Sequence, residues 1–324
     1  MKAALCKSLE GPGGVVIEDV PDPAAGTGEV VVRVKAAALN FFDILITRGK
    51  YQSKPPLPFS PSGEIAGVVE SLGRDVTGLR PGDRVMAYVG WGGAREKVVI
   101  RAGQAVPVPS EVADTVASGL AVTYGTAIHG LKDRAELRRG ETVAVLGASG
   151  GAGLAAVEIA KLMGARVIAA ASSEEKLAVC RAHGADHTIN YNAADLKEAL
   201  REATGGRGVD VVYDCVGDRY AEQAVRSLAW NGRFLVVGFA AGEIPRLPLN
   251  LLMLKGAAAI GVFWGKSVER DPDRHRANMT DVLGWVASGR LEPRIHGVYP
   301  LEEIVAALNV IDRREAIGKV VLSL

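Results

Sequence analysis

One segment near the middle of the chain, residues 142–154, constrains the fold more than any other. It opens with a short apolar run, residues 142–146, of the kind that forms a buried strand. A glycine-rich turn at 147–153 follows, and then an alanine-rich pattern typical of a helix. This strand–turn–helix layout is that of a dinucleotide-binding loop. Gly150 would let backbone approach a pyrophosphate, and Gly153 would let the helix pack closely on the strand.

The free N–H groups at the start of that helix, together with its dipole, would hold the phosphates. Aligned on the G-x-G-x-x-G pattern, the first glycine position holds Ala148, whose small side chain still permits the turn. The turn residues that we expect to contact a dinucleotide are Ser149, Gly150, Gly151, Ala152 and Gly153.

The position of this loop in a chain of 324 residues predicts two domains, because one hydrophobic core seldom serves so many residues. The part before it is rich in short strand candidates separated by proline and glycine clusters, with one helical patch at 40–47. Such a pattern favours a small, partly open barrel. The strand candidates of this part are 29–37, 65–72, 84–89 and 94–100.

From about residue 116 the pattern changes to alternating strands and helices, after a first helix at 117–131. Alternation of this kind predicts an α/β fold, a doubly wound parallel sheet covered on both faces. The six predicted strands are 142–147, 166–171, 186–190, 209–214, 233–238 and 258–263. The helices predicted between them include 153–163, 174–183 and 193–204.

The tail has two predicted helices, 281–287 and 302–311, and a strand at 319–324. It is too short for a domain of its own, so we expect it to pack on the N-terminal part. The predicted domains are therefore residues 1–117 with 266–324, and residues 118–265.

The formal net charge of +1 gives no electrostatic basis for binding nucleic acid or an anionic membrane surface. The three cysteines lie far apart with no CxxC spacing, which disfavours a disulfide framework and a cysteine-rich zinc site. No apolar run approaches the roughly 20 residues of a membrane span, and the N-terminus has no signal-peptide pattern. We therefore expect a cytoplasmic protein that acts on a small molecule.

The end of the second predicted strand bears on the choice of nicotinamide cofactor. An NAD-specific site places an acidic residue there, about 20 residues past the loop, to bind the ribose 2′-hydroxyl. Here the strand ends in Ser172 and Ser173, and Lys176 follows within one turn. Hydroxyls and an ammonium group suit a 2′-phosphate, so NADPH is favoured over NADH. Ser173 followed by Glu174 is equally a helix-capping pattern, and both interpretations can hold together.

Several short motifs, in order along almost the full chain, resemble those of the medium-chain dehydrogenase/reductase superfamily, in its zinc-free quinone oxidoreductase branch. They are residues 40–43 (NFFD), 63–67 (GEIAG), 81–85 (PGDRV), 148–153 (ASGGAG), 206–214 (GRGVDVVYD), 232–239 (GRFLVVGF) and 317–322 (IGKVVL). The resemblance implies a GroES-like catalytic domain, a Rossmann domain and an active-site cleft between them.

The resemblance also bears on metal. Zinc-dependent members carry a cysteine near the position of Asn40, a histidine near Gly63 and a second cysteine near Leu120, and this chain has none of the three. The region 85–110, where a structural zinc lobe would fall, contains no cysteine. The five histidines show no ligand-like clustering. We therefore expect no metal.

Without a Lewis acid, the enzyme must stabilise developing negative charge through hydrogen bonds. A quinone or an α,β-unsaturated carbonyl can be reduced in this way, because the negative charge that develops on it is delocalised. The resemblance places Asn40 beside the nicotinamide and Tyr51 near the acceptor, and both are the predicted catalytic residues. Asn40 is alternatively a helix cap, and Tyr51 a turn residue packed on prolines. A further tyrosine of some relatives falls at Leu45.

The remaining predicted cofactor contacts follow from the resemblance and from the rule that ligands bind at the carboxyl ends of parallel strands. For the aromatic members, core packing is the alternative interpretation. Beyond the loop, the predicted contacts are Asn40, Thr123, Ser172, Ser173, Lys176, Tyr191, Val216, Gly217, Gly238, Phe239, Phe263, Trp264, Gly265 and Lys319.

The predicted activity is NADPH-dependent reduction of a quinone or enone. One alternative is an enoyl-CoA or other enoyl-thioester reductase, for which Arg48, Lys50 and Lys54 would offer a basic patch. Another is a non-catalytic NADPH-binding protein, since fold does not fix function. The apolar last strand, residues 257–263, invites pairing with a second copy, and the family precedent is a homodimer formed in this way.

Overall fold

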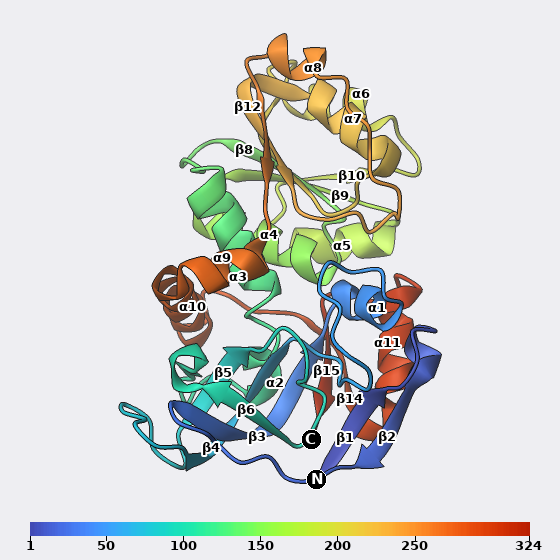
Figure 1. Cartoon of the computed structure of the whole chain (residues 1–324). Helices are drawn as coiled ribbons and strands as arrows, with labels where there is room; N and C mark the ends of the chain where they lie inside the picture. The colour runs from blue at the N-terminus through green and yellow to red at the C-terminus, as the bar shows by residue number, and fades with distance from the viewer. The chain divides into compact units, whose positions relative to one another are not determined.

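A parallel six-stranded sheet lies at the centre of residues Thr123–Lys266, one of two compact units in the computed structural model, which describes residues 1–324 (Figure 1). We call it the central unit. Its strand order, β10-β9-β8-β11-β12-β13, is that of a doubly wound dinucleotide-binding fold, which confirms the predicted fold class. The strands are β8 (Thr142–Leu146), β9 (Arg166–Ala171), β10 (His187–Asn190), β11 (Val209–Asp214), β12 (Leu228–Val236) and β13 (Ala258–Gly261).

Helices cover both faces of this sheet, so β8, β9 and β11 are buried along almost their whole length. Leucine, alanine and valine side chains of α6, α7 and α8 pack on one face, while α4 contacts β8 and β9. The helical elements of this unit are α3 (Thr123–Ile128), a π-helical turn η3 (His129–Arg134), α4 (Gly151–Leu162), α5 (Glu174–Ala182), α6 (Leu196–Ala203), α7 (Asp218–Arg226), α8 (Asn250–Met253) and the start of α9 (Trp264–Arg270).

The second unit, Met1–Val122 with Ser267–Leu324, is called the N/C unit because it combines both ends of the chain. Its main sheet has the order β14-β15-β3-β4-β5-β7, with β6 paired to β3. The C-terminal strand β15 pairs antiparallel with β3 in this sheet. Its strands are β1 (Lys2–Cys6), β2 (Val15–Asp19), β3 (Glu29–Leu39), β4 (Glu64–Leu72), β5 (Arg84–Tyr88), β6 (Lys97–Arg101), β7 (Val106–Pro107), β14 (Ile295–Pro300) and β15 (Lys319–Ser323).

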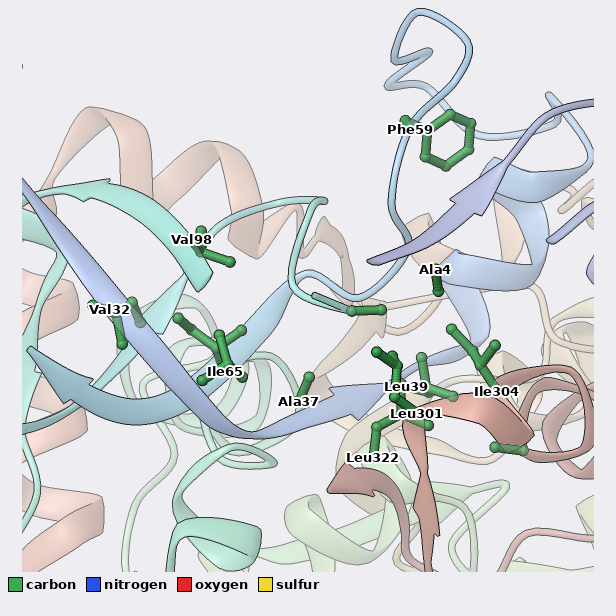
Figure 2. Close-up of a cluster of buried hydrophobic side chains, with 14 of the residues drawn as sticks. Ala4, Val32, Ala37, Leu39, Phe59, Ile65, Val98, Leu301, Ile304 and Leu322 are labelled. Carbon is green, nitrogen blue, oxygen red and sulfur yellow. The ribbon is translucent and has the colours of Figure 1, made fainter. Parts of the chain in front are cut away.

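Figure 2 shows the core of the N/C unit, where Leu39 of β3, Leu322 of β15 and Ile304 of α11 gather beside Leu301. Each of these four side chains is at most 3% exposed. This core therefore ties the C-terminal segment to β3. The helices of the unit are α1 (Phe41–Thr47), α2 (Asp114–Ala117), α10 (Pro272–Ala287) and α11 (Ile304–Asp312), with short 3-10 turns η1 (Pro12–Gly14), η2 (Ala102–Gln104) and η4 (Leu301–Glu303).

Two predicted helices differ in the structure. The single helix expected at 117–131 is broken, because the chain turns between α2 and α3 and the N–H of Val122 donates to Glu64 Oε2. The helix expected at 281–287 begins at Pro272, where Asp271 caps it by accepting from the N–H of Arg274. An aspartate followed by proline at the first helical position is a start signal that apolar periodicity misses.

None of the helices combines the length and the apolar character that crossing a membrane requires.

Candidate active site

A buried network of three side chains lies in the N/C unit, formed by Asn40, Glu64 and Lys319. Lys319 Nζ donates to Asn40 Oδ1 at 2.6 Å, to Glu64 Oε1 at 2.8 Å and to the carbonyl oxygen of Leu39 at 3.2 Å. Asn40 Nδ2 also donates to Glu64 Oε1, at 2.9 Å. Their residues are 7%, 0% and 3% exposed, so the ammonium and the carboxylate form a buried, hydrogen-bonded ion pair.

Strand register brings these three residues together from distant parts of the sequence. Glu64 opens β4 and stands opposite Ala38 on β3, while Lys319 opens β15, whose next residue, Val320, pairs with Leu39. Asn40 directly follows β3 and occupies the N-cap position of α1. Two antiparallel neighbours of β3 thus deliver one acid and one base to the end of that strand.

Asp43 anchors the start of α1 beneath this network. Its two carboxylate oxygens accept from the backbone N–H groups of Asn40, at 2.8 Å, and of Ser62, at 2.9 Å. Burial raises the pKa of Asp43 to about 7, although both hydrogen bonds and the charge of Lys319 act in the opposite direction. The Asp43 carboxylate thus closes the first turn of α1 onto the backbone of Asn40, while the Asn40 side chain contacts Glu64 and Lys319.

Tyr51, the other predicted catalytic residue, is half-buried in the same unit. Its ring lies 5.6 Å from that of Phe42, centroid to centroid, and packs on the core of the unit. Burial raises the pKa of the Tyr51 phenol, and the carboxylate of Asp43 adds to this effect. At neutral pH the hydroxyl is therefore protonated and able to donate a hydrogen bond.

The glycine-rich turn of the central unit has the geometry that its sequence predicts. Gly147 has a φ of 71°, which favours glycine, and a Cβ there would lie 2.9 Å from Val216. A Cβ at Gly153 would lie 2.2 Å from the Gly147 carbonyl oxygen, so only glycine lets α4 start this close to β8. A Cβ at Gly150, the N-cap of α4, would meet only that oxygen, at 3.6 Å. The surface of the turn is therefore bare backbone at Gly150.

Polar side chains gather where β9 and β10 end. Ser173 caps α5 by accepting from the N–H of Lys176, and Lys176 Nζ lies 3.4 Å from Ser172 Oγ. The segment therefore combines both predicted features: Ser173 caps α5, and the ammonium group of Lys176 lies beside the hydroxyl of Ser172. The ring of Tyr191, just after β10, packs against Tyr220 with 4.6 Å between centroids.

Sequence reasoning missed two members of this cluster, Asn192 and Tyr220. Asn192 Nδ2 donates to the carbonyl oxygen of Ser172 at 3.0 Å, and the Tyr220 hydroxyl lies 3.3 Å from Asn192 Oδ1. The position of Asn192 directly after Tyr191, at the end of a predicted strand, was the available signal.

The carboxyl ends of β11 and β12 form a second turn region in the central unit. Asp214 Oδ1 accepts from the N–H groups of Val216 and Gly217, and Gly217 has a φ of 71°. A Cβ on Gly217 would lie 2.9 Å from the ring of Phe239, which follows Gly238 after β12.

Past β13, the two aromatic residues differ in exposure. Trp264 is buried against Gly125, where a Cβ would lie 2.8 Å from its indole, whereas Phe263 is 57% exposed. Thr123 opens α3 and is buried. Gly265 follows Trp264 in the first turn of α9.

The structure thus joins Asn40 and Lys319 directly and places Tyr51 in the same unit, while the other predicted residues belong to the central unit. Glu64 was missed as a site residue. An acid within an otherwise apolar strand pattern, residues 63–67, was the signal, because such an acid is seldom buried without a partner. No group of three or more histidine, cysteine, aspartate or glutamate side chains is arranged to hold a metal ion.

Comparison with known proteins gives matches across the chain. Two family models match, one described as alcohol dehydrogenase GroES-like domain over residues 26–110 and one as zinc-binding dehydrogenase over residues 151–285. A quinone oxidoreductase-like protein 2 homolog of Nematostella vectensis is 40% identical, and the match covers 99% of this chain and 88% of that protein.

Two solved structures extend this likeness to three dimensions. A probable oxidoreductase from Mycobacterium abscessus is 40% identical, with a TM-score of 0.90, and the match covers 100% of this chain and 99% of that one. The quinone oxidoreductase of Escherichia coli, solved in complex with NADPH, is 26% identical, with a TM-score of 0.91 and complete coverage of both chains.

Proposed function

Because this chain is an oxidoreductase of the medium-chain dehydrogenase/reductase superfamily, in its zinc-free quinone oxidoreductase branch, we propose that it is an NADPH-dependent, zinc-independent reductase of quinones or α,β-unsaturated carbonyls. The observation that carries this proposal is the Asn40 amide, an uncharged hydrogen-bond donor held by a buried ion pair. In a reductase of this branch, such a donor can stabilise charge on a conjugated acceptor.

The central unit offers the features that a nicotinamide dinucleotide requires. The turn at Gly150 presents bare backbone, and the first N–H groups of α4 have no acceptor within the helix, so they are able to bind a pyrophosphate. Ser172, Ser173, Lys176 and Tyr191 would surround the 2′-phosphate, and Lys176 would supply the opposite charge. The complex of the Escherichia coli quinone oxidoreductase with NADPH supports this choice of cofactor.

The other residues that would hold the dinucleotide lie at strand ends and in the loops that follow them. They are Asn40, Thr123, Ser149, Gly151, Ala152, Gly153, Val216, Gly217, Gly238, Phe239, Phe263, Trp264 and Gly265. For Lys319 the resemblance also implies a cofactor contact, although its ammonium group donates to three acceptors of the N/C unit.

When bound, the reduced nicotinamide would supply a hydride, and a proton from solvent would complete reduction to a hydroquinone or a saturated carbonyl. Asn40 and Tyr51 would donate hydrogen bonds to the acceptor oxygen, on which negative charge develops as the hydride arrives. Burial keeps the Tyr51 phenol protonated for this task. These neutral donors suit a conjugated acceptor better than a simple ketone, which needs stronger polarisation.

The enoyl-thioester alternative would need a basic patch for a CoA phosphate. Arg48 forms a bidentate ion pair with Asp312, at 2.8 and 2.7 Å, so its charge is already matched within the N/C unit. Lys50 and Lys54 remain for such a patch. No observation favours this activity over quinone or enone reduction, and the substrate panel below includes it.

The test is a substrate panel in which NADPH oxidation is followed by its absorbance. It contains a benzoquinone, a simple enone, crotonyl-CoA and a primary alcohol, each with NADPH and with NADH. We expect turnover of the quinone or the enone, unchanged after exhaustive chelation. Loss of activity with EDTA, restored by zinc, would refute zinc independence. Tight NADPH binding without turnover of any acceptor would identify a non-catalytic NADPH-binding protein instead.

We also propose a homodimer formed through the central unit. β13 lies at the edge of its sheet, and its residues Ala258 and Ala259 are exposed. Large apolar side chains of the same unit are exposed as well, among them Trp230, Leu249 and Met253 at 72–77%. Sedimentation velocity should give a dimer for the wild type and a monomer for Ala259→Lys, whereas Val298→Lys, on the edge strand β14, should stay dimeric.

A further inference from the structure

We propose that Lys319 and Glu64 act as positioning residues which convert the Asn40 amide into a fixed and polarised hydrogen-bond donor for the substrate oxygen. This inference rests on the proposed reductase function and deepens it. It gives Lys319 a task inside the N/C unit, in place of the direct cofactor contact that the family resemblance implies.

The hydrogen-bond capacity of Lys319 is fully used within this network. An ammonium group has three hydrogens, and Lys319 Nζ has three acceptors in this network: Asn40 Oδ1, Glu64 Oε1 and the carbonyl oxygen of Leu39. No hydrogen is left for a ligand. Lys319 therefore influences a substrate through Asn40 rather than by direct contact.

The orientation of the Asn40 amide is set by its two charged neighbours. Its Oδ1 faces the ammonium group at 2.6 Å, and its Nδ2 faces the Glu64 carboxylate at 2.9 Å. A flipped amide would turn its N–H groups toward the cation and its oxygen toward the carboxylate, and both contacts would be repulsive. Lys319 and Glu64 together thus select one orientation, in which one Nδ2 hydrogen binds Glu64 and the second has no partner in the chain.

The ammonium group of Lys319 also polarises the Asn40 amide. A cation on the oxygen of an amide withdraws electron density from its nitrogen, which makes the remaining N–H a stronger donor. The charge of Glu64 opposes this effect only in part, because its oxygens also accept from Lys319 Nζ and from the N–H of Val122. Since Asn40 is 7% exposed, water screens the ammonium charge little. The second N–H is therefore preorganised to stabilise an oxygen that gains negative charge.

Crowding around Lys319 keeps this arrangement in place. A Cβ at Gly119 would lie 3.1 Å from Lys319 Cε and 3.2 Å from its Cγ, so the lysine stem packs tightly against the backbone of Gly119. The isosteric variant Lys319→Met removes the charge and preserves this packing, but it leaves Glu64 buried without its cation. The double variant Glu64→Gln/Lys319→Met removes both charges and is the one to use for kinetics.

The kinetic experiment compares the wild type with this double variant on the quinone or enone that the panel identifies. We expect kcat to fall about tenfold or more, because a misoriented and unpolarised donor is lost, while the KM for NADPH changes less than about twofold. The control is Arg84→Met, which breaks the Arg84–Asp114 ion pair of the same unit and should leave kcat unchanged. An unchanged kcat in the double variant would refute the proposal.

A second readout needs neither turnover nor cofactor. In protein labelled with ¹⁵N at asparagine, the side-chain amide signal of Asn40 is identified by its absence from Asn40→Ser. In the wild type the Nδ2 proton that binds the Glu64 carboxylate should lie well downfield of the other, so the two protons should be farther apart than in a solvent-exposed asparagine. In Glu64→Gln/Lys319→Met their separation should fall toward that of a solvent-exposed asparagine, whereas Arg84→Met should leave it unchanged. A wild-type separation that already equals that of a solvent-exposed asparagine would overturn the inference, even if the panel finds no substrate. The panel can also show no turnover while the amide signals change as expected between the wild type and the double variant. In that case only the proposed function is refuted.

Discussion

Lys319 Nζ and Asn40 Oδ1 lie 2.6 Å apart, although 279 residues separate them in the chain. The pairing of β15 with β3 sets this distance, since Val320 stands opposite Leu39 and both neighbours then meet at the end of β3. The candidate catalytic amide is thus held by the last strand of the protein. Changes to this pair should therefore affect the stability of the N/C unit as well as activity.

Moving the carboxylate from position 64 to position 40, with Asn40→Asp and Glu64→Gln, tests this coupling. Asn40→Asp places a second carboxylate where Nδ2 now donates to Glu64 at 2.9 Å, and we expect it to cost roughly 2–4 kcal/mol of unfolding free energy. Adding Glu64→Gln restores a donor–acceptor pair and the same total charge. Urea unfolding of the two single variants and the double variant should then give a coupling above about 1 kcal/mol.

The matched control pairs Asn40→Asp with Asp312→Asn, which removes the partner of Arg48 and shares no partner with Asn40. These two changes should add. Additivity in the Asn40–Glu64 cycle as well would contradict a direct hydrogen bond between the two side chains.

Replacing Gly153 by alanine should lower the stability of the protein, whereas replacing Gly150 should not. Gly153→Ala introduces a Cβ 2.2 Å from the Gly147 carbonyl oxygen, so the turn or α4 must shift, and we expect a loss of about 2 kcal/mol or more. Gly150→Ala meets only ordinary contacts, with that oxygen at 3.6 Å, so its melting temperature should stay near that of the wild type.

The same Gly150→Ala variant should bind NADPH about tenfold or more weakly, because its methyl group stands where backbone would approach the pyrophosphate. Reduced-nicotinamide fluorescence measures this affinity. A stable Gly150→Ala variant that binds NADPH with wild-type affinity would show that the pyrophosphate does not bind at this turn.

Lys176 should select NADPH over NADH. Its ammonium group lies beside the Ser172 hydroxyl at the end of β9, and the first turn of α5 also carries Glu174 and Glu175. Removing the cation leaves those carboxylates facing a 2′-phosphate, so Lys176→Ala should lower the NADPH-to-NADH affinity ratio about tenfold, more so at low salt. Lys197→Ala, which removes an exposed lysine paired with Glu198, should leave the ratio unchanged. A ratio unaffected by Lys176→Ala would refute this role.

Much of the central unit could be predicted from the sequence, because consecutive residues specify each of its strands, turns and helices. Residues 142–154 carry the strand, the turn and the helix start in consecutive positions, and Gly153 proved to be required sterically. The six strands and their alternation with helices likewise follow from runs of apolar residues. The start of β12 at Leu228 is an exception, since Asn231, with a φ of 59°, and Gly232 interrupt the apolar pattern.

The site of the N/C unit was less accessible to sequence reasoning, because it depends on strand register between distant segments. Asn40 was predicted from a family motif and Lys319 as a cofactor contact, but nothing in their sequence neighbourhoods indicates that they touch. Glu64 completes the pair only because β4 and β15 both lie beside β3. The only signal in the sequence was an acid directly before one predicted strand and a lysine in another, each within an apolar pattern.

The pH dependence of stability should report on Asp43. Burial raises the pKa of this carboxyl to about 7, whereas an aspartate in the unfolded chain titrates near pH 3.9. Between about pH 4 and 7 the folded protein therefore holds a proton that the unfolded chain has released, and stability contributed by Asp43 falls as the pH rises. Asp43→Asn cannot titrate, so the wild type should lose about 2 kcal/mol relative to this variant between pH 5 and 7. Urea unfolding at each pH measures the difference. A gap that stays constant with pH would mean that the two backbone N–H groups of Asn40 and Ser62 keep the carboxylate ionised in the folded state.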